Sequence, residues 1–374
     1  MFLVLAALAV LAAASTLSST LLHLSLPAPT GDYAVGKAVT VVEDPSRDEP
    51  ATVDGTDRRA VRLVAWYPAQ PETGEGAAYV EDLDRIGDGL VASGSIGPLE
   101  RVGLGFVSTT ARRDAEVVAT DGGYPVVILS PGNATNVEFY GALAEDLASH
   151  GYVVIGLDHP YQSAAVAIGD RVATYAGDPP AGESAAVVRA RIDERVADIG
   201  FVLDRLASDA AGISVLDDRL DLERVAAIGH SNGGMAAVQV CDDPRVRACI
   251  NIDGQSLAGP FGTGSDPIAP HNPLLFLTKE TELHPALAQA FEDGGTGGFR
   301  VVVPAAEHDS FTDGPRFRPR LLPISGTADA VTTVARGFTL AFLEHTLRNA
   351  PRTLFGQVEA PTDVFVSVYP LVSQ

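Results

Sequence analysis

Uninterrupted apolar runs alternate along the chain with segments of helical periodicity. The continuous apolar runs, typical of strands buried on both faces, are residues 124–130, 152–157, 224–228, 248–252, 274–278 and 299–303. Segments with a helical pattern lie between or after them, at residues 137–150, 184–206, 235–240 and 329–348. Two further strands are expected earlier, at 30–46 and 59–67. This alternation predicts an α/β fold whose mostly parallel central sheet is covered by helices on both faces.

Residues 80–115 interrupt this pattern. They are moderately apolar but lack a strand period, so we expect short helices inserted over the core, a candidate lid. The rest of the chain contains no internal repeat and no linker that would divide it. We therefore expect one domain over residues 28–374.

The N-terminal 26 residues carry no charged side chain. The stretch is long enough to span a bilayer, and Pro27 and Pro29 end it before the globular pattern begins. The stretch lacks the basic n-region of a typical secretory signal peptide, although residues 12–14 are alanines, small residues of the kind found at cleavage sites. Residues 1–27 are expected to be a signal peptide or a membrane anchor. Either role would place the remaining chain outside the cytoplasm, secreted or membrane-anchored.

Composition excludes several functions. The 374 residues carry a formal net charge of −22, which argues against nucleic acid as a partner. No Cys/His cluster supports a structural zinc site or thiol redox chemistry, so no metal is expected. The two cysteines, Cys241 and Cys249, could form a short-loop disulfide in an oxidising compartment or be two buried thiols.

A Gly-x-Ser-x-Gly pattern at Gly229–Gly233 carries the strongest chemical signal. It connects a short apolar strand to a helix, and the turn must be so tight that a side chain at 229 or 233 would clash with the chain. Such a corner presents the Ser231 hydroxyl beyond the end of the strand, above the unpaired amides of the helix N-terminus. Ser231 is the candidate nucleophile; the alternative is a glycine-rich turn that contains a serine.

Two further candidates follow later strands, in the chain order Ser, Asp, His that α/β-hydrolases share. In a parallel sheet the carboxyl ends of the strands meet at one edge, so Ser231, Asp253 and His308 are expected to lie together. His308 would accept the proton of Ser231, and Asp253 would orient the imidazole. Asp253 could instead be a turn or N-cap residue, and His308 a plain loop histidine. Glu280, after the next strand, is the rival acid.

An oxyanion intermediate needs two preorganised backbone amides. One is expected from Asn232, directly after the nucleophile. The other is expected from Asn133, in the turn 131–134 that follows the strand 124–130. We call residues 131–134 the oxyanion turn.

With these residues in place, the chain resembles the platelet-activating factor acetylhydrolase family of α/β-hydrolases, in its bacterial, extracytoplasmic form. The motifs that carry the resemblance are at 26–31, 65–69, 129–132, 146–152, 195–198, 202–206, 229–234, 253–254 and 308–311. The resemblance implies a single α/β-hydrolase domain, Asp253 as the acid, no calcium and no cofactor, and a lipid ester as substrate. The oxyanion turn differs, because animal members have a His-Gly-Leu-Gly type of turn where this chain has Pro131-Gly132-Asn133-Ala134.

The expected function is therefore a serine carboxylic ester hydrolase acting on short or oxidised acyl phospholipids through an acyl-Ser231 intermediate. The pattern also resembles bacterial cutinases and polyester hydrolases, so a broad-specificity carboxylesterase is the nearest alternative. A catalytically silent, membrane-tethered binding protein is the alternative of another class. The sequence leaves the oligomeric state open.

Overall fold

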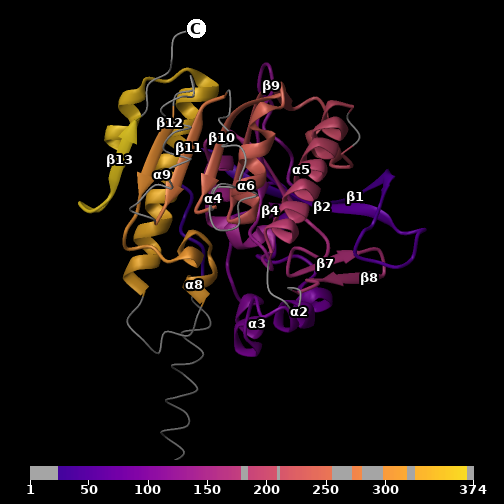
Figure 1. Ribbon diagram of the computed structural model, residues 1–374. Helices are drawn as coiled ribbons and strands as arrows, with labels where there is room; N and C mark the ends of the chain where they lie inside the picture. The colour runs from indigo at the N-terminus through magenta and orange to yellow at the C-terminus, as the bar shows by residue number, and fades with distance from the viewer. Residues whose placement is uncertain are drawn as a thin grey trace, which may run out of the picture.

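The computed structural model describes residues 24–177, 184–208, 211–254, 272–279, 298–317 and 325–368. Its strands form an 11-stranded sheet in the order β13-β12-β11-β10-β9-β5-β6-β2-β1-β4-β3 (Figure 1). The six strands from β12 to β6 run parallel, and β2, β1 and β13 add antiparallel edges. The predicted fold class, a mostly parallel sheet of the α/β-hydrolase type, is confirmed.

The apolar runs predicted as central strands are buried on both faces, and β5, β6, β10, β11 and β12 lie within two residues of their predicted limits, whereas β9 begins four residues before the predicted start at 224. The long strands are β1 Ala34–Asp48, β2 Arg58–Ala69, β5 Tyr124–Ser130, β6 Val153–Asp158, β9 Leu220–His230, β10 Val246–Ile252, β11 Leu274–Thr278 and β12 Gly298–Val302. The remaining strands of the sheet are β3 Glu75–Gly76, β4 Arg112–Arg113 and β13 Phe365–Val368. The exposed edge strand β13 was not predicted.

Helices cover both faces of the sheet. Side chains alternate along each strand, so Val127 and Leu129 of β5 pack on one face and Val126 and Ile128 on the other. The first face is covered by α4 Gly141–Ser149 and α9 Ser325–Arg348, and the second by α5 Ala185–Ala207 and α6 Asn232–Gln239 (Figure 1). The single helix expected at 137–150 is instead the 3-10 turn η1 Val137–Tyr140 followed by α4. The Val137 amide donates to the Asp158 carboxylate across the sheet edge, at 2.7 Å.

The segment 80–115 contains short helices, as expected. These are α2 Leu83–Ala92 and α3 Pro98–Leu104. They share a separate apolar cluster with Phe139 of η1 and Phe317 of α8 Gly314–Phe317. The unpredicted hairpin of β7 Ala165–Ile168 and β8 Arg171–Thr174 lies against α2. The insertion therefore stands beside η1 and α8; its role as a lid stays a prediction.

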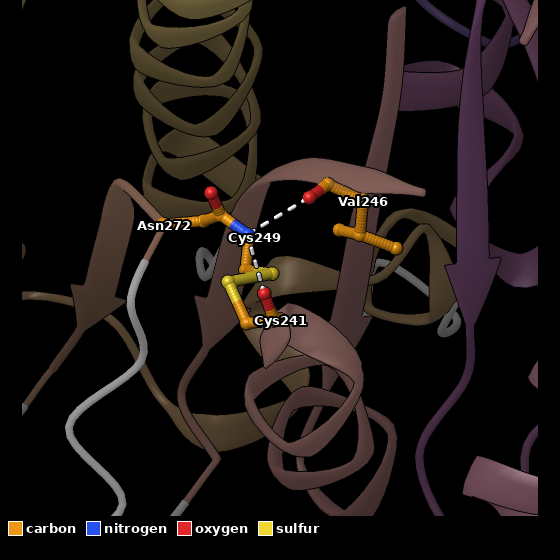
Figure 2. The surroundings of a disulfide bond; sticks show 4 residues. All are labelled: Cys241, Val246, Cys249 and Asn272. Carbon is orange, nitrogen blue, oxygen red and sulfur yellow. Dashed lines mark hydrogen bonds between the residues drawn. A yellow bond between two sulfur atoms is a disulfide. The ribbon is translucent and has the colours of Figure 1, made fainter. Parts of the chain in front are cut away.

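Cys241 and Cys249 form a disulfide, which decides between the two alternatives left open by the sequence (Figure 2). Cys241 lies in the 3-10 turn η3 Val240–Asp242, and Cys249 lies in β10. The side-chain amide of Asn272 donates to the carbonyl oxygens of Cys241 and Val246, at 2.7 and 2.9 Å. The disulfide and Asn272 together fix the end of α6 to the sheet.

The predicted signal peptide or anchor, residues 1–27, lies outside the described residues except for its last four. Within the described ranges, no helix combines the length and apolar character needed to cross a membrane.

Candidate active site

Ser231 occupies a strained corner between β9 and α6, with φ 54° and ψ −122°. A Cβ on Gly229 would lie 2.0 Å from the Gly233 carbonyl oxygen, and a Cβ on Gly233 would lie 2.1 Å from the Ser130 carbonyl oxygen. The predicted clash at both glycines is confirmed. Such strained backbone is concentrated at functional sites, where the surrounding fold maintains it.

Asp253 and His308 meet although 55 residues separate them. His308 Nδ1 lies 2.6 Å from Asp253 Oδ2. The other carboxylate oxygen of Asp253 accepts from the Thr278 hydroxyl at 3.0 Å and from the Lys279 amide at 3.2 Å. Burial raises the pKa of Asp253, but the hydrogen bonds from His308, Lys279 and Thr278 outweigh it and leave that pKa below its usual value. Asp253 is therefore an ionised partner for the His308 imidazole. The rival acid, Glu280, lies outside the described residues.

Ser231, the candidate nucleophile, lies against the same strand end. Its amide donates to the Ile252 carbonyl, one residue before Asp253, at 3.0 Å. His308 begins the 3-10 turn η4 His308–Phe311, and its side chain is 44% exposed, so a substrate can reach it. Among the described contacts, no hydrogen bond joins the Ser231 hydroxyl to His308. Catalytic hydrogen bonds of this kind are often long before substrate binds.

The oxyanion turn passes directly over the corner at Ser231. A Cβ on Gly132 would lie 3.4 Å from Ser231 Cβ. The Gly132 amide donates to the Tyr140 hydroxyl at 3.0 Å, and the Ala134 amide donates to the Gln162 carbonyl at 2.8 Å. The two amides that flank Asn133 are thus already committed within the protein. The second predicted donor, Asn232, is buried at the first position of α6.

His230 has a position that the sequence did not reveal. Its Nδ1 lies 2.8 Å from the Tyr140 hydroxyl, and its Nε2 lies 3.0 Å from the His308 carbonyl oxygen. Burial, followed by the nearby His308, lowers the pKa of His230 to about 3, so the ring is neutral. The carbonyl can only accept, so Nε2 carries the proton and Nδ1 accepts from Tyr140. His230 thereby connects the oxyanion turn, through Tyr140, to the His308 loop.

A pocket of about 240 Å³ opens beside the oxyanion turn. The insertion, the oxyanion turn with η1, and the chain after His308 all contribute to it. Its apolar lining includes Ile96, Leu104, Phe139 and Phe317, and its polar lining includes Ser95, Glu100, Thr135, Asp309 and Thr312. Across the described ranges, no cluster of three or more His, Cys, Asp or Glu side chains could hold a metal ion.

Two family descriptions match the chain. "Platelet-activating factor acetylhydrolase, isoform II" matches residues 19–184, and "alpha/beta hydrolase fold" matches residues 125–278. Both matches include strands of the central sheet, and the second also includes the strand-to-helix corner at Ser231.

Several known proteins are similar over much of the chain. A platelet-activating factor acetylhydrolase of Cavia porcellus is 26% identical over 62% of this chain and 56% of its own length. A probable 1-alkyl-2-acetylglycerophosphocholine esterase of Arthroderma benhamiae is 26% identical over 70% of this chain and 66% of its own length. The matched region thus spans between about half and two thirds of these curated relatives.

One solved structure is similar to this chain over nearly its whole length. The ferulic acid esterase from Streptomyces cinnamoneus has a TM-score of 0.70 and 28% sequence identity, covering 92% of this chain and 99% of that one. The resemblance inferred from the sequence is confirmed: the chain has the α/β-hydrolase fold and resembles the platelet-activating factor acetylhydrolases.

Proposed function

We propose that this protein is a serine carboxylic ester hydrolase with Ser231 as nucleophile, His308 as base and Asp253 as the orienting acid. The observation that carries the proposal is the 2.6 Å contact between His308 Nδ1 and Asp253 Oδ2, at the strand end that also presents Ser231 in a strained corner. The His308 side chain is 44% exposed, so a substrate can reach this pair.

In the acylation step, His308 Nε2 accepts the proton of the Ser231 hydroxyl as its oxygen attacks the ester carbonyl. Asp253 stabilises the imidazolium that forms. The amides of Asn133 and Asn232 are the proposed donors to the tetrahedral oxyanion. His308 then returns the proton to the leaving alcohol, and the acyl group stays on Ser231.

In the deacylation step, His308 accepts a proton from water, which attacks the acyl-Ser231 carbonyl. The second tetrahedral intermediate collapses, the carboxylic acid leaves, and His308 returns the proton to Ser231. The side chains of the triad and two amides suffice for the reaction.

The proposed substrate is an ester of a short or oxidised acyl chain, on a phospholipid or a similar lipid. The pocket of about 240 Å³ supports a substrate group of limited size beside Asn133, the proposed oxyanion donor; Ser231, Asp253 and His308 are not among its lining residues. The similarity to acetylhydrolases supports the phospholipid. The similarity to a ferulic acid esterase over nearly the whole chain instead favours the second candidate, a broad-specificity carboxylesterase or polyesterase.

The proposed location is extracytoplasmic, with residues 1–27 as a signal peptide or membrane anchor. The Cys241–Cys249 disulfide supports it, because such bonds persist in oxidising compartments. A silent binding protein is disfavoured because serine, acid and base are all present, whereas such proteins usually lose one member.

Hydrolysis rates on four substrates distinguish these candidates: acetyl-phosphatidylcholine, long-acyl phosphatidylcholine, p-nitrophenyl butyrate and a polyester film. Preference for the acetyl lipid over the long-acyl lipid supports the phospholipid substrate. Turnover of p-nitrophenyl butyrate or the film without the acetyl lipid supports the general esterase. No turnover of any substrate by folded protein would contradict both.

A further inference from the structure

Contacts from the protein interior hold the oxyanion turn in an unfavourable backbone conformation. Ala134 has φ 50°, a left-handed conformation that side chains other than glycine seldom adopt. Residues of this kind persist only where the surrounding structure fixes them. The contacts that fix this turn therefore determine how well its backbone amides are oriented toward an oxyanion.

Arg195 contacts three residues of the oxyanion turn. It lies on α5, has no solvent exposure, and donates along the turn from inside the protein. Its Nη1 lies 2.7 Å from the Pro131 carbonyl oxygen. Its Nη2 lies 3.2 Å from Asn133 Oδ1 and 3.5 Å from the Gly132 carbonyl oxygen.

The same guanidinium also fixes the residue that holds Ala134. Arg195 Nε donates to Gln162 Oε1 at 2.8 Å, and the Gln162 carbonyl accepts from the strained Ala134 amide at 2.8 Å. Arg195 therefore acts on both ends of the oxyanion turn.

A second Ser–His–Asp set orients Arg195 from the other side. Ser130 Oγ lies 2.9 Å from His159 Nε2, and His159 Nδ1 lies 2.8 Å from Asp198 Oδ2. All three are fully buried, so no substrate can reach this serine. Burial, followed by the nearby Arg195, lowers the pKa of His159 to about 4, so its ring is neutral and accepts from Ser130. Because the Ser130 hydroxyl donates its proton to His159, its oxygen accepts from Arg195 Nη1, at 3.2 Å.

The contact with the Gly132 carbonyl has an electronic consequence. That carbonyl and the Asn133 N–H belong to one peptide unit. A cation at the oxygen draws electron density from the amide and makes its N–H a stronger donor, as in any hydrogen-bonded chain of dipoles. Burial lowers the pKa of Arg195 to about 10, which leaves the guanidinium charged at neutral pH.

We propose that Arg195 is a positioning residue for the ester hydrolase reaction: it fixes the oxyanion turn and polarises the Asn133 amide toward the developing oxyanion. The role rests on the proposed function. The buried Ser130–His159–Asp198 set orients Arg195 and does not itself act as a nucleophile.

The test compares Arg195→Lys with wild type on p-nitrophenyl butyrate, together with inhibition by a trifluoromethyl ketone, whose serine adduct carries an oxyanion. A lysine keeps the charge but replaces the planar guanidinium with a single compact ammonium, which cannot reproduce the separate contacts with Pro131, Asn133 and Gln162. Because small displacements at a reacting centre cost up to about 100-fold, we expect kcat to fall roughly 10- to 100-fold. KM should stay within about twofold, since the ester itself needs no oxyanion hole to bind. The ketone Ki should rise in parallel with the loss in kcat/KM.

Arg336→Lys is the matched control. Arg336 is another buried arginine, on α9, where it donates to Asp146 and to the Ala28 carbonyl oxygen. Its loss should lower the melting temperature without changing kcat or the ketone Ki. If Arg195→Lys does not fold, Asn133→Ala removes one Arg195 acceptor at a half-buried position and should raise the ketone Ki several-fold.

A folded Arg195→Lys with wild-type kcat, or one whose kcat falls with an unchanged ketone Ki, would overturn the role of Arg195. An Asn133→Ala with unchanged Ki would do so where Arg195→Lys cannot be made. A wild-type protein without any ester turnover would overturn the proposed function and this role with it. The two failures are therefore distinguishable.

Discussion

The Nε2 atom of His230 lies 3.0 Å from the carbonyl oxygen of His308, and this contact joins the residue before the proposed nucleophile, Ser231, to the proposed base. The connection continues through His230 Nδ1 to the Tyr140 hydroxyl, and from there to the Gly132 amide. One neutral ring thus sets the spacing between the oxyanion turn and the His308 loop.

Tyr140→Phe tests this connection with little change in shape. It would leave the Gly132 amide and His230 Nδ1 buried without their partner, which costs about 1–3 kcal/mol of unfolding free energy. We expect urea denaturation to report that loss, with a lower kcat on p-nitrophenyl butyrate. Unchanged stability and unchanged kcat would mean that the contact has no structural role.

Asp253→Asn tests the orienting acid. An amide at 253 cannot stabilise the imidazolium and favours the wrong tautomer of His308, so kcat should fall by up to about 10⁴-fold with little change in KM. Asp204→Asn, at an exposed carboxylate on α5, is the control and should keep wild-type kcat. Activity in Asp253→Asn close to wild type would assign the acid to another residue.

Asp313 predicts a specific dependence of stability on pH. It is buried and accepts from the Tyr79 hydroxyl at 3.0 Å and the Ala142 amide at 3.2 Å. Burial raises the pKa of Asp313 to about 7, above its value of 3.8 in an unfolded chain. The folded protein therefore keeps this proton where the unfolded chain has lost it. The stability it contributes is fully present below about pH 4 and is lost as the pH rises through about 7.

Asp313→Asn isolates this contribution. The difference in unfolding free energy, wild type minus variant, should fall by at most about 1.4 kcal/mol per pH unit between about pH 4 and 7, and then level off. Chemical denaturation of both proteins across this range measures the difference. A difference independent of pH would show that Asp313 is ionised in the folded state.

The disulfide predicts a loss of stability on reduction. Cys241 and Cys249 are 8 residues apart, and closing so short a loop in the unfolded chain is worth about 2.5 kcal/mol. Cys241→Ala combined with Cys249→Ala should lower the unfolding free energy by about that amount and make it insensitive to dithiothreitol. Wild-type protein with equal stability under oxidising and reducing conditions would contradict the bond.

The core strands of the sheet can be predicted from the sequence, because each is a continuous apolar run within a few neighbouring residues. The strands β5 and β11 match their predicted limits, since each is an apolar run bounded by turn residues. The hairpin β7–β8 was missed because each strand has only four residues, and β13 was missed because it is exposed and contains a serine. Spacing alone explains Gly229, because the clash it avoids is with Gly233 of the same turn, whereas the clash that Gly233 avoids is with the Ser130 and Pro131 carbonyls, which only the fold brings there.

The support of the site could not be read from the sequence. Arg195 reaches the oxyanion turn across more than 60 residues, and His230 reaches His308 across 78. Buried polar groups pair with residues that are distant in the sequence, and such pairs leave no periodic pattern in the local sequence. Ser130 illustrates the limit: it contacts a histidine that contacts an aspartate, but all three side chains are buried and Ser130 lies in a strand, whereas Ser231 lies in a strained corner.

The most direct test of the central claim is to treat protein lacking residues 1–27 with a fluorophosphonate and to locate the adduct by mass spectrometry. The account predicts one adduct, on Ser231, none on Ser130, and loss of both adduct and ester turnover in Ser231→Ala with the fold retained. No adduct on folded protein, or an adduct on any other serine, would contradict it.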